Sequence, residues 1–199
     1  METVTITRRP TLLPVGGRLR TLLGVAALAV AIVGVVLWVD RPADDGVTSV
    51  NLTGDIAAAA PEVGAPAPDF RITTTDGKVV SLSDYKGQPV WLVFGASWCA
   101  DCRAEAADLQ ATYQTFKDKG LQVLQVSIEE DTQAVKDYAG RVGLTFPMAA
   151  DPQTIVAGQY RILGIPTHYF IDRDGIISQM RIGGMPATDM TAAAGSIVE

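Results

Sequence analysis

The two cysteines of the chain constrain its fold and its chemistry more than any other feature. They are Cys99 and Cys102, in the sequence WCADC at 98–102, and no other cysteine occurs among the 199 residues. Two thiols at this spacing can close a disulfide within one helical turn, which suits reversible exchange better than the stapling of distant segments. The pair follows the apolar run PVWLVFG at 89–95 and precedes a helical pattern. We therefore predict a redox pair at a strand-to-helix junction.

The composition argues against several other kinds of site. From residue 42 onward the chain carries 11 Lys and Arg against 20 Asp and Glu, a net charge of −9, with no basic cluster. An acidic domain of this kind does not fit nucleic-acid binding. A structural zinc ion takes about four Cys, His or carboxylate ligands, and the chain offers two cysteines and one histidine. We therefore expect neither a metal site nor a cofactor.

The N-terminal part predicts a membrane anchor. Residues 1–20 are polar and basic, whereas 21–39 contain no charged residue over a length that can span a bilayer as a helix. A cleaved signal peptide is the alternative, but its apolar region is shorter, about 7–15 residues, and the sequence after Trp38 is a poor cleavage site. Four arginines precede the apolar segment. The positive-inside rule therefore predicts a single-pass protein with 1–20 in the cytoplasm and the rest outside it.

The remaining sequence predicts a linker and one α/β domain. Residues 40–61 are rich in Ala, Asp, Gly, Pro and Thr and indicate a flexible linker. The domain spans 62–199 and opens with a small β-hairpin, 69–72 and 79–81, around the turn TDG at 75–77. Further strands are expected at 89–95, 121–128, 146–149, 165–171 and 176–182, and helices at 99–119, 132–142, 151–161 and 187–198. Their order predicts a mixed sheet with helices on both faces.

The two cysteines are expected to have unequal roles. Cys99 lies at the predicted helix N-terminus, where the helix dipole and unpaired amides favour a thiolate. It follows Trp98 at the end of a loop, so we expect it to be the exposed nucleophile. Cys102 lies one turn into the helix and should face the core as the resolving thiol. The charge of Asp101, between the cysteines, disfavours a nearby thiolate and would make the pair less strongly oxidising.

Glu105 is the candidate proton acceptor of the site. It stands three residues after Cys102 and four before Leu109, on the helix stripe that otherwise carries core residues. A carboxylate there should be partly buried, and burial favours its protonated form. Because it is one turn from Cys102, it could take the proton of the buried thiol during exchange. The alternative is a solvated glutamate at the edge of the stripe.

A second group of interest is Ile165-Pro166-Thr167. Proline cannot donate to a strand ladder and belongs at a strand start or edge. If the Pro166 peptide is cis, it makes a tight turn and leaves the backbone of Ile165 free to pair with a substrate strand. His168, the only histidine, is expected to be a half-buried sheet residue rather than a copper ligand.

These features together resemble the membrane-anchored thioredoxin-like proteins of the TlpA/ResA/CcmG type. The resemblance covers about residues 62–185, and its motifs are VGAPAPDF at 63–70, SLSDYKG at 81–87, FGASWCADCRAE at 94–105, FP at 146–147, Asp151, and GIPTHYFIDRDG at 164–175. It implies an α/β thioredoxin fold, here with the hairpin as an N-terminal extension and preceded by the membrane helix. It also implies a cis Pro166 beside the cysteines, a nucleophilic Cys99, a resolving Cys102 and an active-site acid at Glu105. We expect Trp98, Ile165 and Pro166 to contact the substrate.

The resemblance further implies a reductase of exported proteins. Such proteins reduce disulfides outside the cytoplasm, apocytochrome c being one common client, and receive electrons from a membrane thiol carrier of the DsbD/CcdA type. A monomer is the default expectation. A thiol peroxidase of the peroxiredoxin kind is one alternative, but it needs a threonine three residues before its reactive cysteine, where Ala96 stands. A copper chaperone of the Sco kind is another, but it uses a CxxxC motif and a differently placed histidine.

Overall fold

The computed structural model describes residues 16–39 and 60–199, and the chain divides into two units, Met1–Val47 and Thr48–Glu199. The first unit contains helix α1, Gly16–Val39, whose described side chains, those of 23–35, are exposed. Among the described residues, no helix is both long and apolar enough to cross a bilayer. The anchor at 21–39 therefore stays a prediction. Most of the predicted tail, 1–20, and linker, 40–61, lies outside the described residues.

The second unit is built on a five-stranded mixed sheet. Its order is β5-β4-β3-β6-β7. Strands β3, β4 and β5 are parallel, whereas β6 pairs antiparallel with β3 and β7 pairs antiparallel with β6. The bounds are Val90–Gly95 for β3, Gln122–Ile128 for β4, Met148–Asp151 for β5, Thr167–Ile171 for β6 and Ile177–Ile182 for β7. The mixed sheet predicted from the order of elements is confirmed.

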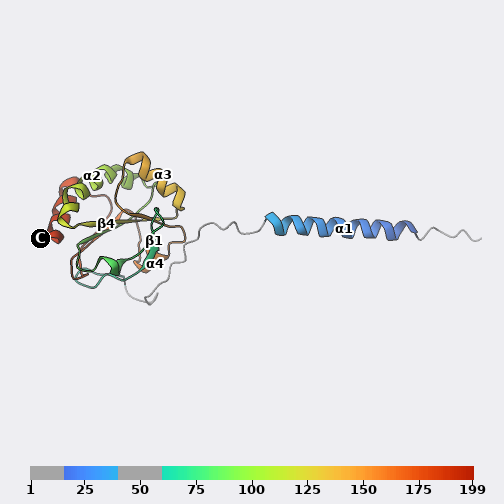
Figure 1. Ribbon diagram of the computed structural model, residues 1–199, viewed down its shortest axis with the longest axis horizontal. Helices are drawn as coiled ribbons and strands as arrows, with labels where there is room; N and C mark the ends of the chain where they lie inside the picture. The colour runs from blue at the N-terminus through green and yellow to red at the C-terminus, as the bar shows by residue number, and fades with distance from the viewer. Residues whose placement is uncertain (1–15, 40–59) are drawn as a thin grey trace, which may run out of the picture. The chain divides into compact units, whose positions relative to one another are not determined.

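Helices cover both faces of the sheet, so that β3 is buried along its whole length. Side chains of β3 alternate between two apolar clusters, with Trp91 on one face and Leu92 on the other. Figure 1 shows α2 and α3 on one side of β4 and α4 on the other. The helices are α2 Ala100–Phe116, α3 Thr132–Val142, α4 Ile155–Gln159 and α5 Ala187–Val198, with 3₁₀ turns at Leu82–Tyr85 and Lys117–Lys119. This layered arrangement is a thioredoxin-like α/β fold.

A two-stranded ribbon precedes the sheet. Strand β1, Arg71–Thr73, pairs antiparallel with β2, Val79–Ser81. The ribbon reaches β5 through a bridge between Thr74 and Ala149 and through a hydrogen bond of 2.7 Å from the Thr75 N–H to the Met148 carbonyl. Because β5 is the last strand on its side of the sheet, the ribbon satisfies backbone groups that an edge strand would otherwise expose.

The segment between β5 and α4 differs from the prediction. The strand expected at 146–149 runs from Met148 to Asp151, and the helix expected to open at Asp151 begins at Ile155. The reason is the Asp151 carboxylate, which accepts hydrogen bonds from the amides of Ile155, at 2.8 Å, and Ala157, at 2.9 Å. Asp151 therefore ends the strand and satisfies the helix N-terminus from outside it. Its burial raises the pKa of the carboxyl group, and the amide donors oppose that shift.

Candidate active site

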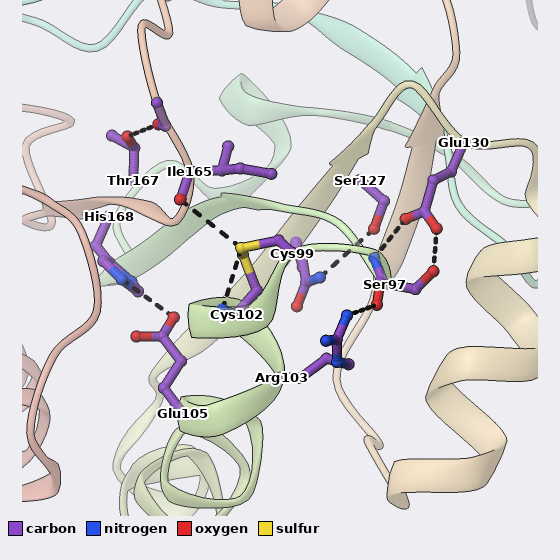
Figure 2. The surroundings of a disulfide bond; sticks show 12 residues. Ser97, Cys99, Cys102, Arg103, Glu105, Ser127, Glu130, Ile165, Thr167 and His168 are labelled. Atoms are coloured by element: carbon purple, nitrogen blue, oxygen red, sulfur yellow. Dashed lines mark hydrogen bonds and ion pairs between the residues drawn. A yellow bond between two sulfur atoms is a disulfide. The ribbon is translucent and has the colours of Figure 1, made fainter.

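Cys99 and Cys102 form a disulfide at the start of α2. Cys99 is the N-cap of the helix, and its Sγ accepts the backbone N–H of Cys102 at 3.1 Å (Figure 2). The predicted strand-to-helix junction is confirmed, because β3 ends at Gly95 and α2 begins at Ala100. The unpaired amides of a helix N-terminus favour negative charge. The sulfur of Cys99 thus lies where a thiolate gains most from the helix.

The expected difference in exposure between the cysteines is wrong for the disulfide form. Cys99 is 7% exposed and Cys102 is 6% exposed. The Sγ of Cys99 lies 3.7 Å from the carbonyl oxygen of Ile165, and the half-buried Ile165 packs against the small cluster formed by Ala96 and the two cysteines. Neighbouring Trp98 is the exposed residue, at 52%. The two cysteines therefore differ in their position on the helix and hardly at all in their exposed fraction.

The turn before β6 lies beside the disulfide. The Ile165–Pro166 peptide is cis, as the resemblance implies. Pro166 is buried, and its carbonyl accepts the Gly183 N–H at 2.8 Å. The Ile165 N–H makes no hydrogen bond within the part of the chain that the structure describes. The turn thus presents a free backbone donor next to Cys99.

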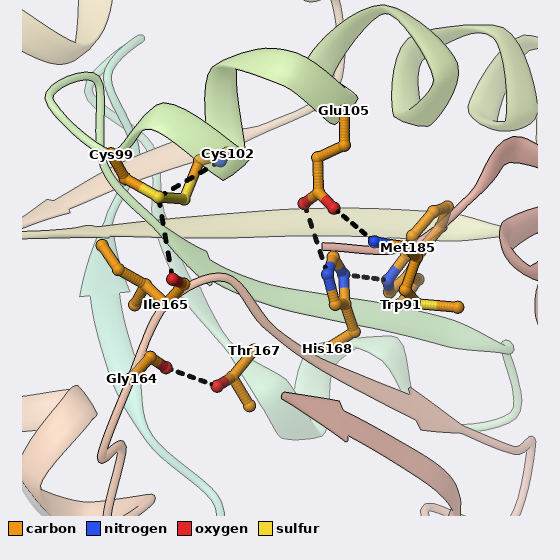
Figure 3. A network of polar contacts seen from close by, with 9 residues as sticks. All are labelled: Trp91, Cys99, Cys102, Glu105, Gly164, Ile165, Thr167, His168 and Met185. Atoms are coloured by element: carbon orange, nitrogen blue, oxygen red, sulfur yellow. Dashed lines mark hydrogen bonds and ion pairs between the residues drawn. A yellow bond between two sulfur atoms is a disulfide. The ribbon is translucent and has the colours of Figure 1, made fainter. Parts of the chain in front are cut away.

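Glu105 is buried on the inner side of α2, so the alternative of a solvated glutamate is wrong. The residue is 5% exposed. Its Oε2 accepts the backbone N–H of Met185 at 3.0 Å, and its Oε1 lies 3.3 Å from Nε2 of His168 (Figure 3). His168 is itself 0% exposed, which corrects the expectation of a half-buried histidine. The reason is that β6 is an inner strand of the sheet, covered on both faces.

The other ring nitrogen of His168 faces Trp91 on the neighbouring strand. The indole Nε1 of Trp91 donates to Nδ1 of His168 at 3.3 Å. An indole nitrogen can only donate, so Nδ1 is an unprotonated acceptor and the neutral ring carries its hydrogen on Nε2. That hydrogen is directed toward the side of Glu105, although the approach of Nε2 to Oε1 does not reach hydrogen-bond geometry. Three buried side chains from β3, β6 and α2 thus form a polar chain beside the cysteines.

A second polar group holds the loop that precedes Cys99. Glu130, which follows β4 and is 7% exposed, accepts hydrogen bonds from the backbone N–H of Ser97, at 2.8 Å, and from its hydroxyl. Arg103 donates from Nη1 to the Ser97 carbonyl at 2.9 Å. Figure 2 shows these side chains converging on Ser97 from α2 and from the end of β4. The loop therefore enters the helix in one fixed conformation.

Sequence reasoning missed Trp91, Glu130 and Arg103 and gave His168 no role. A usable signal existed for Trp91 and His168, because each brings a ring nitrogen that needs a partner into a strand expected to be buried. Glu130 carried no local signal, since its partner lies 33 residues away in the chain. Among the described residues, no group of three or more His, Cys, Asp or Glu side chains could hold a metal ion.

The chain is similar in sequence and in fold to known thiol–disulfide oxidoreductases. Residues 63–180 match the model of the AhpC/TSA family. The thiol-disulfide oxidoreductase ResA of Geobacillus kaustophilus is 37% identical over 128 residues, which are 64% of this chain and 74% of the relative. A crystal structure of a thiol:disulfide interchange protein of the thioredoxin family from Chlorobium tepidum superposes with a TM-score of 0.62 at 28% identity, covering 72% of this chain and all of that one. StoA from Bacillus subtilis superposes with a TM-score of 0.56 at 28% identity, covering 65% and 98%.

The fold and the cysteine pair define a thioredoxin-like protein that exchanges dithiols and disulfides. The chain belongs to the AhpC/TSA family, and among that family's members it is similar to the ResA oxidoreductases. Its activity is that of a thiol–disulfide oxidoreductase acting through Cys99 and Cys102.

The contacts of Glu130 predict a measurable contribution to stability. Glu130→Gln removes the charge that strengthens both hydrogen bonds to Ser97, and bonds to charged groups contribute about 1.5–3 kcal/mol. We expect the free energy of unfolding, measured with urea, to fall by about 1 kcal/mol. The matched control is Glu129→Gln, at the exposed neighbouring position, which should leave it unchanged. Equal changes in the free energy of unfolding for the two substitutions would contradict a stabilising role of the Glu130 contacts with Ser97.

Proposed function

We propose that the chain is a disulfide reductase that acts outside the cytoplasm on exported proteins, from a membrane anchor at 21–39. The observation that carries the proposed mechanism is the hydrogen bond from the Cys102 N–H to the Cys99 sulfur at the start of α2. It supports Cys99 as the thiol that ionises and attacks. The position of Asp101 in the first turn of the helix supports the reducing direction, because its charge disfavours a strongly stabilised thiolate.

The reaction would run in two exchange steps. The Cys99 thiolate attacks one sulfur of the client disulfide, a mixed disulfide forms, and the first client sulfur leaves as a thiolate. Cys102 then loses its proton and attacks Sγ of Cys99, which releases the second client sulfur. Two electrons have passed from the dithiol to the client, and the protein is left with the Cys99–Cys102 disulfide. A membrane thiol carrier of the DsbD/CcdA type would return the dithiol by the reverse exchange.

Glu105 is proposed as the group that takes the proton of Cys102. It is buried, it lies one turn further along α2, and both of its oxygens have polar neighbours. Without an acceptor, a buried thiol ionises poorly. A carboxylate at this place supplies the acceptor inside the protein while the client covers the site.

The client is proposed to dock on Trp98, Ile165 and Pro166. Trp98 supplies an exposed aromatic surface next to Cys99. The unpaired Ile165 N–H can hydrogen-bond to an extended client segment, as in strand addition at a sheet edge. Apocytochrome c, which carries two cysteines near each other before haem attachment, is a client that fits such a site. The protein is proposed to act as a monomer.

The peroxidase alternative finds no support at the corresponding position. Ala96, three residues before Cys99, is fully buried and has no hydroxyl group with which to bind a peroxide. The copper-chaperone alternative would need a third ligand near the two cysteines. His168 does not supply it, since its two nitrogens face Trp91 and Glu105.

The division of roles between the cysteines predicts different products from two single variants. The reduced full-length protein should reduce insulin disulfides, and Cys99→Ser should abolish that activity because no attacking thiol remains. Cys102→Ser should instead form a stable mixed disulfide between Cys99 and insulin, which mass spectrometry would detect and dithiothreitol would release. A mixed disulfide formed by the Cys99→Ser variant would contradict the assignment, and so would insulin reduction that survives this substitution.

Glu105→Gln should slow the second exchange step, because the amide cannot take a proton. We expect the rate of insulin reduction near neutral pH to fall by about a hundredfold, while alkylation of Cys99 by iodoacetamide is largely unchanged. Asp108→Asn, an exposed carboxylate one turn further along the same helix, is the matched control and should behave as the unsubstituted protein. An unchanged rate of insulin reduction in Glu105→Gln would show that Glu105 does not take the proton of Cys102.

A further inference from the structure

A buried polar chain runs from Trp91 through His168 to Glu105, and dithiol exchange by itself requires neither of the first two residues. Trp91 and His168 are both 0% exposed, and they lie on adjacent strands, β3 and β6. Buried polar groups cost free energy unless they are paired. His168 lies against the candidate proton acceptor, and its other nitrogen is occupied by the Trp91 indole. We therefore looked for a role of this histidine in the exchange reaction.

We propose that His168 is a positioning residue of the reaction. Trp91 holds the His168 ring as the Nε2–H tautomer. The Nε2–H of His168 then orients the Glu105 carboxylate to receive the proton of Cys102. The inference rests on the proposed function and deepens it.

The contact with Trp91 makes His168 a donor and not a proton relay. A proton on Nδ1 would face the N–H of Trp91 at 3.3 Å, so protonation there loses a hydrogen bond and sets two donors against each other. Glu105 is the ionisable group that the structure places against the other nitrogen. The imidazole therefore keeps its one hydrogen on Nε2 throughout the reaction and has no second site through which to pass a proton onward.

The surroundings of Glu105 complete the arrangement. Its Oε2 is held by the Met185 N–H, and a Cβ added at Gly184 would lie 3.7 Å from the same oxygen, so the backbone before α5 closely covers the carboxylate. Its Oε1 faces His168. A carboxylate has about four lone-pair sites, and two donors leave room for a proton. Figure 3 shows Glu105 extending from α2 toward the imidazole, on the same side of the helix as Cys102.

In the disulfide form, the Nε2 approach to Oε1 is short of hydrogen-bond geometry. Hydrogen bonds of catalytic groups are often poorly aligned before the reaction and tighten during it. In the resolving step, the Cys102 thiol gives its proton to Glu105, the resulting thiolate attacks Sγ of Cys99, and the client thiolate leaves. The proton then passes from Glu105 to solvent. No other oxidant or reductant takes part, and the hydrogen on His168 does not move.

Two amide variants of the full-length protein separate positioning from other roles. In His168→Gln the amide nitrogen can take the place of Nε2 and donate to Glu105, whereas the shorter His168→Asn places its amide near Nδ1 and Trp91. We expect His168→Asn to slow insulin reduction by up to about a hundredfold, the effect of a misplaced catalytic group. His168→Gln should restore most of the rate. The loss should fall on kcat with KM unchanged, because His168 does not touch the client.

A purely structural role, carried by the bond to Trp91, predicts the opposite order, with Asn the better replacement. Equal losses in both variants would also overturn the proposal, because they would mean that the imidazole itself must exchange protons. Tyr169→Phe is the matched control, since it alters the next residue of β6, on the opposite face of the sheet, where its hydroxyl bonds to the Tyr160 carbonyl. It should leave the rate unchanged.

A measurement on the unsubstituted protein keeps the proposal testable even if a variant does not fold. His168 is the only histidine of the chain, so its ring ¹⁵N resonances are assigned without ambiguity. We expect Nδ1 unprotonated and Nε2 protonated near neutral pH in both the disulfide and the dithiol form. A proton on Nδ1 in either form would overturn the proposal. Failure of the unsubstituted protein to reduce insulin would contradict the proposed function. If the unsubstituted protein is active, the rates of the His168 variants test the role of His168 alone.

Discussion

The hydrogen bond from the Cys102 amide to the Cys99 sulfur is the interaction on which the rest of the site depends. It exists because α2 begins immediately after the reactive loop, with Cys99 as its N-cap. The helix N-terminus supplies partial positive charge and free N–H groups, and a sulfur placed there is favoured as an anion. The buried strand β3 and the Glu130 contacts with Ser97 hold the loop in the position that this geometry needs.

Around that bond the protein places charged and polar groups inside an otherwise apolar layer. Glu105, His168 and Trp91 are all nearly or fully buried, between the α2 side of the sheet and the helix itself. An unpaired buried charge would destabilise the folded state. The Glu105 carboxylate accordingly lies beside the Met185 N–H and the His168 ring, and the His168 ring lies beside the Trp91 indole N–H. The arrangement supports two separate roles, in which the helix N-terminus favours the thiolate of Cys99 and the Glu105 carboxylate takes the proton of Cys102.

Much of this fold follows from local sequence patterns. The apolar run at 89–95 predicts a strand, and β3 is buried along its whole length. Asp131 is of the residue type that favours an N-cap, and it caps α3 by accepting the Ala134 N–H at 2.8 Å. Gly120 follows the predicted helix at 99–119 and ends the helical segment with a positive φ of 96°, a conformation that glycine adopts readily. These features depend on residues a few positions apart, which is why sequence reveals them.

The features that sequence did not reveal depend on contacts between distant segments. Trp91 and His168 are 77 residues apart, and their pairing follows from the registry of β3 and β6. The burial of Cys99 comes from the Ile165 turn, which no local pattern brings to the cysteines. The start of α4 was misplaced because Asp151 caps it from four residues away, across a turn with Thr154 at a positive φ of 53°.

The helix N-terminus should make Cys99 the more acidic of the two thiols. The most direct test is the thiolate absorbance of the reduced full-length protein as a function of pH, measured in Cys102→Ser for Cys99 and in Cys99→Ser for Cys102. We expect Cys99 to ionise at a lower pH than Cys102 and below about 8.5, where a free cysteine ionises. Ionisation of Cys99 at the same pH as Cys102, or at a higher one, would contradict it.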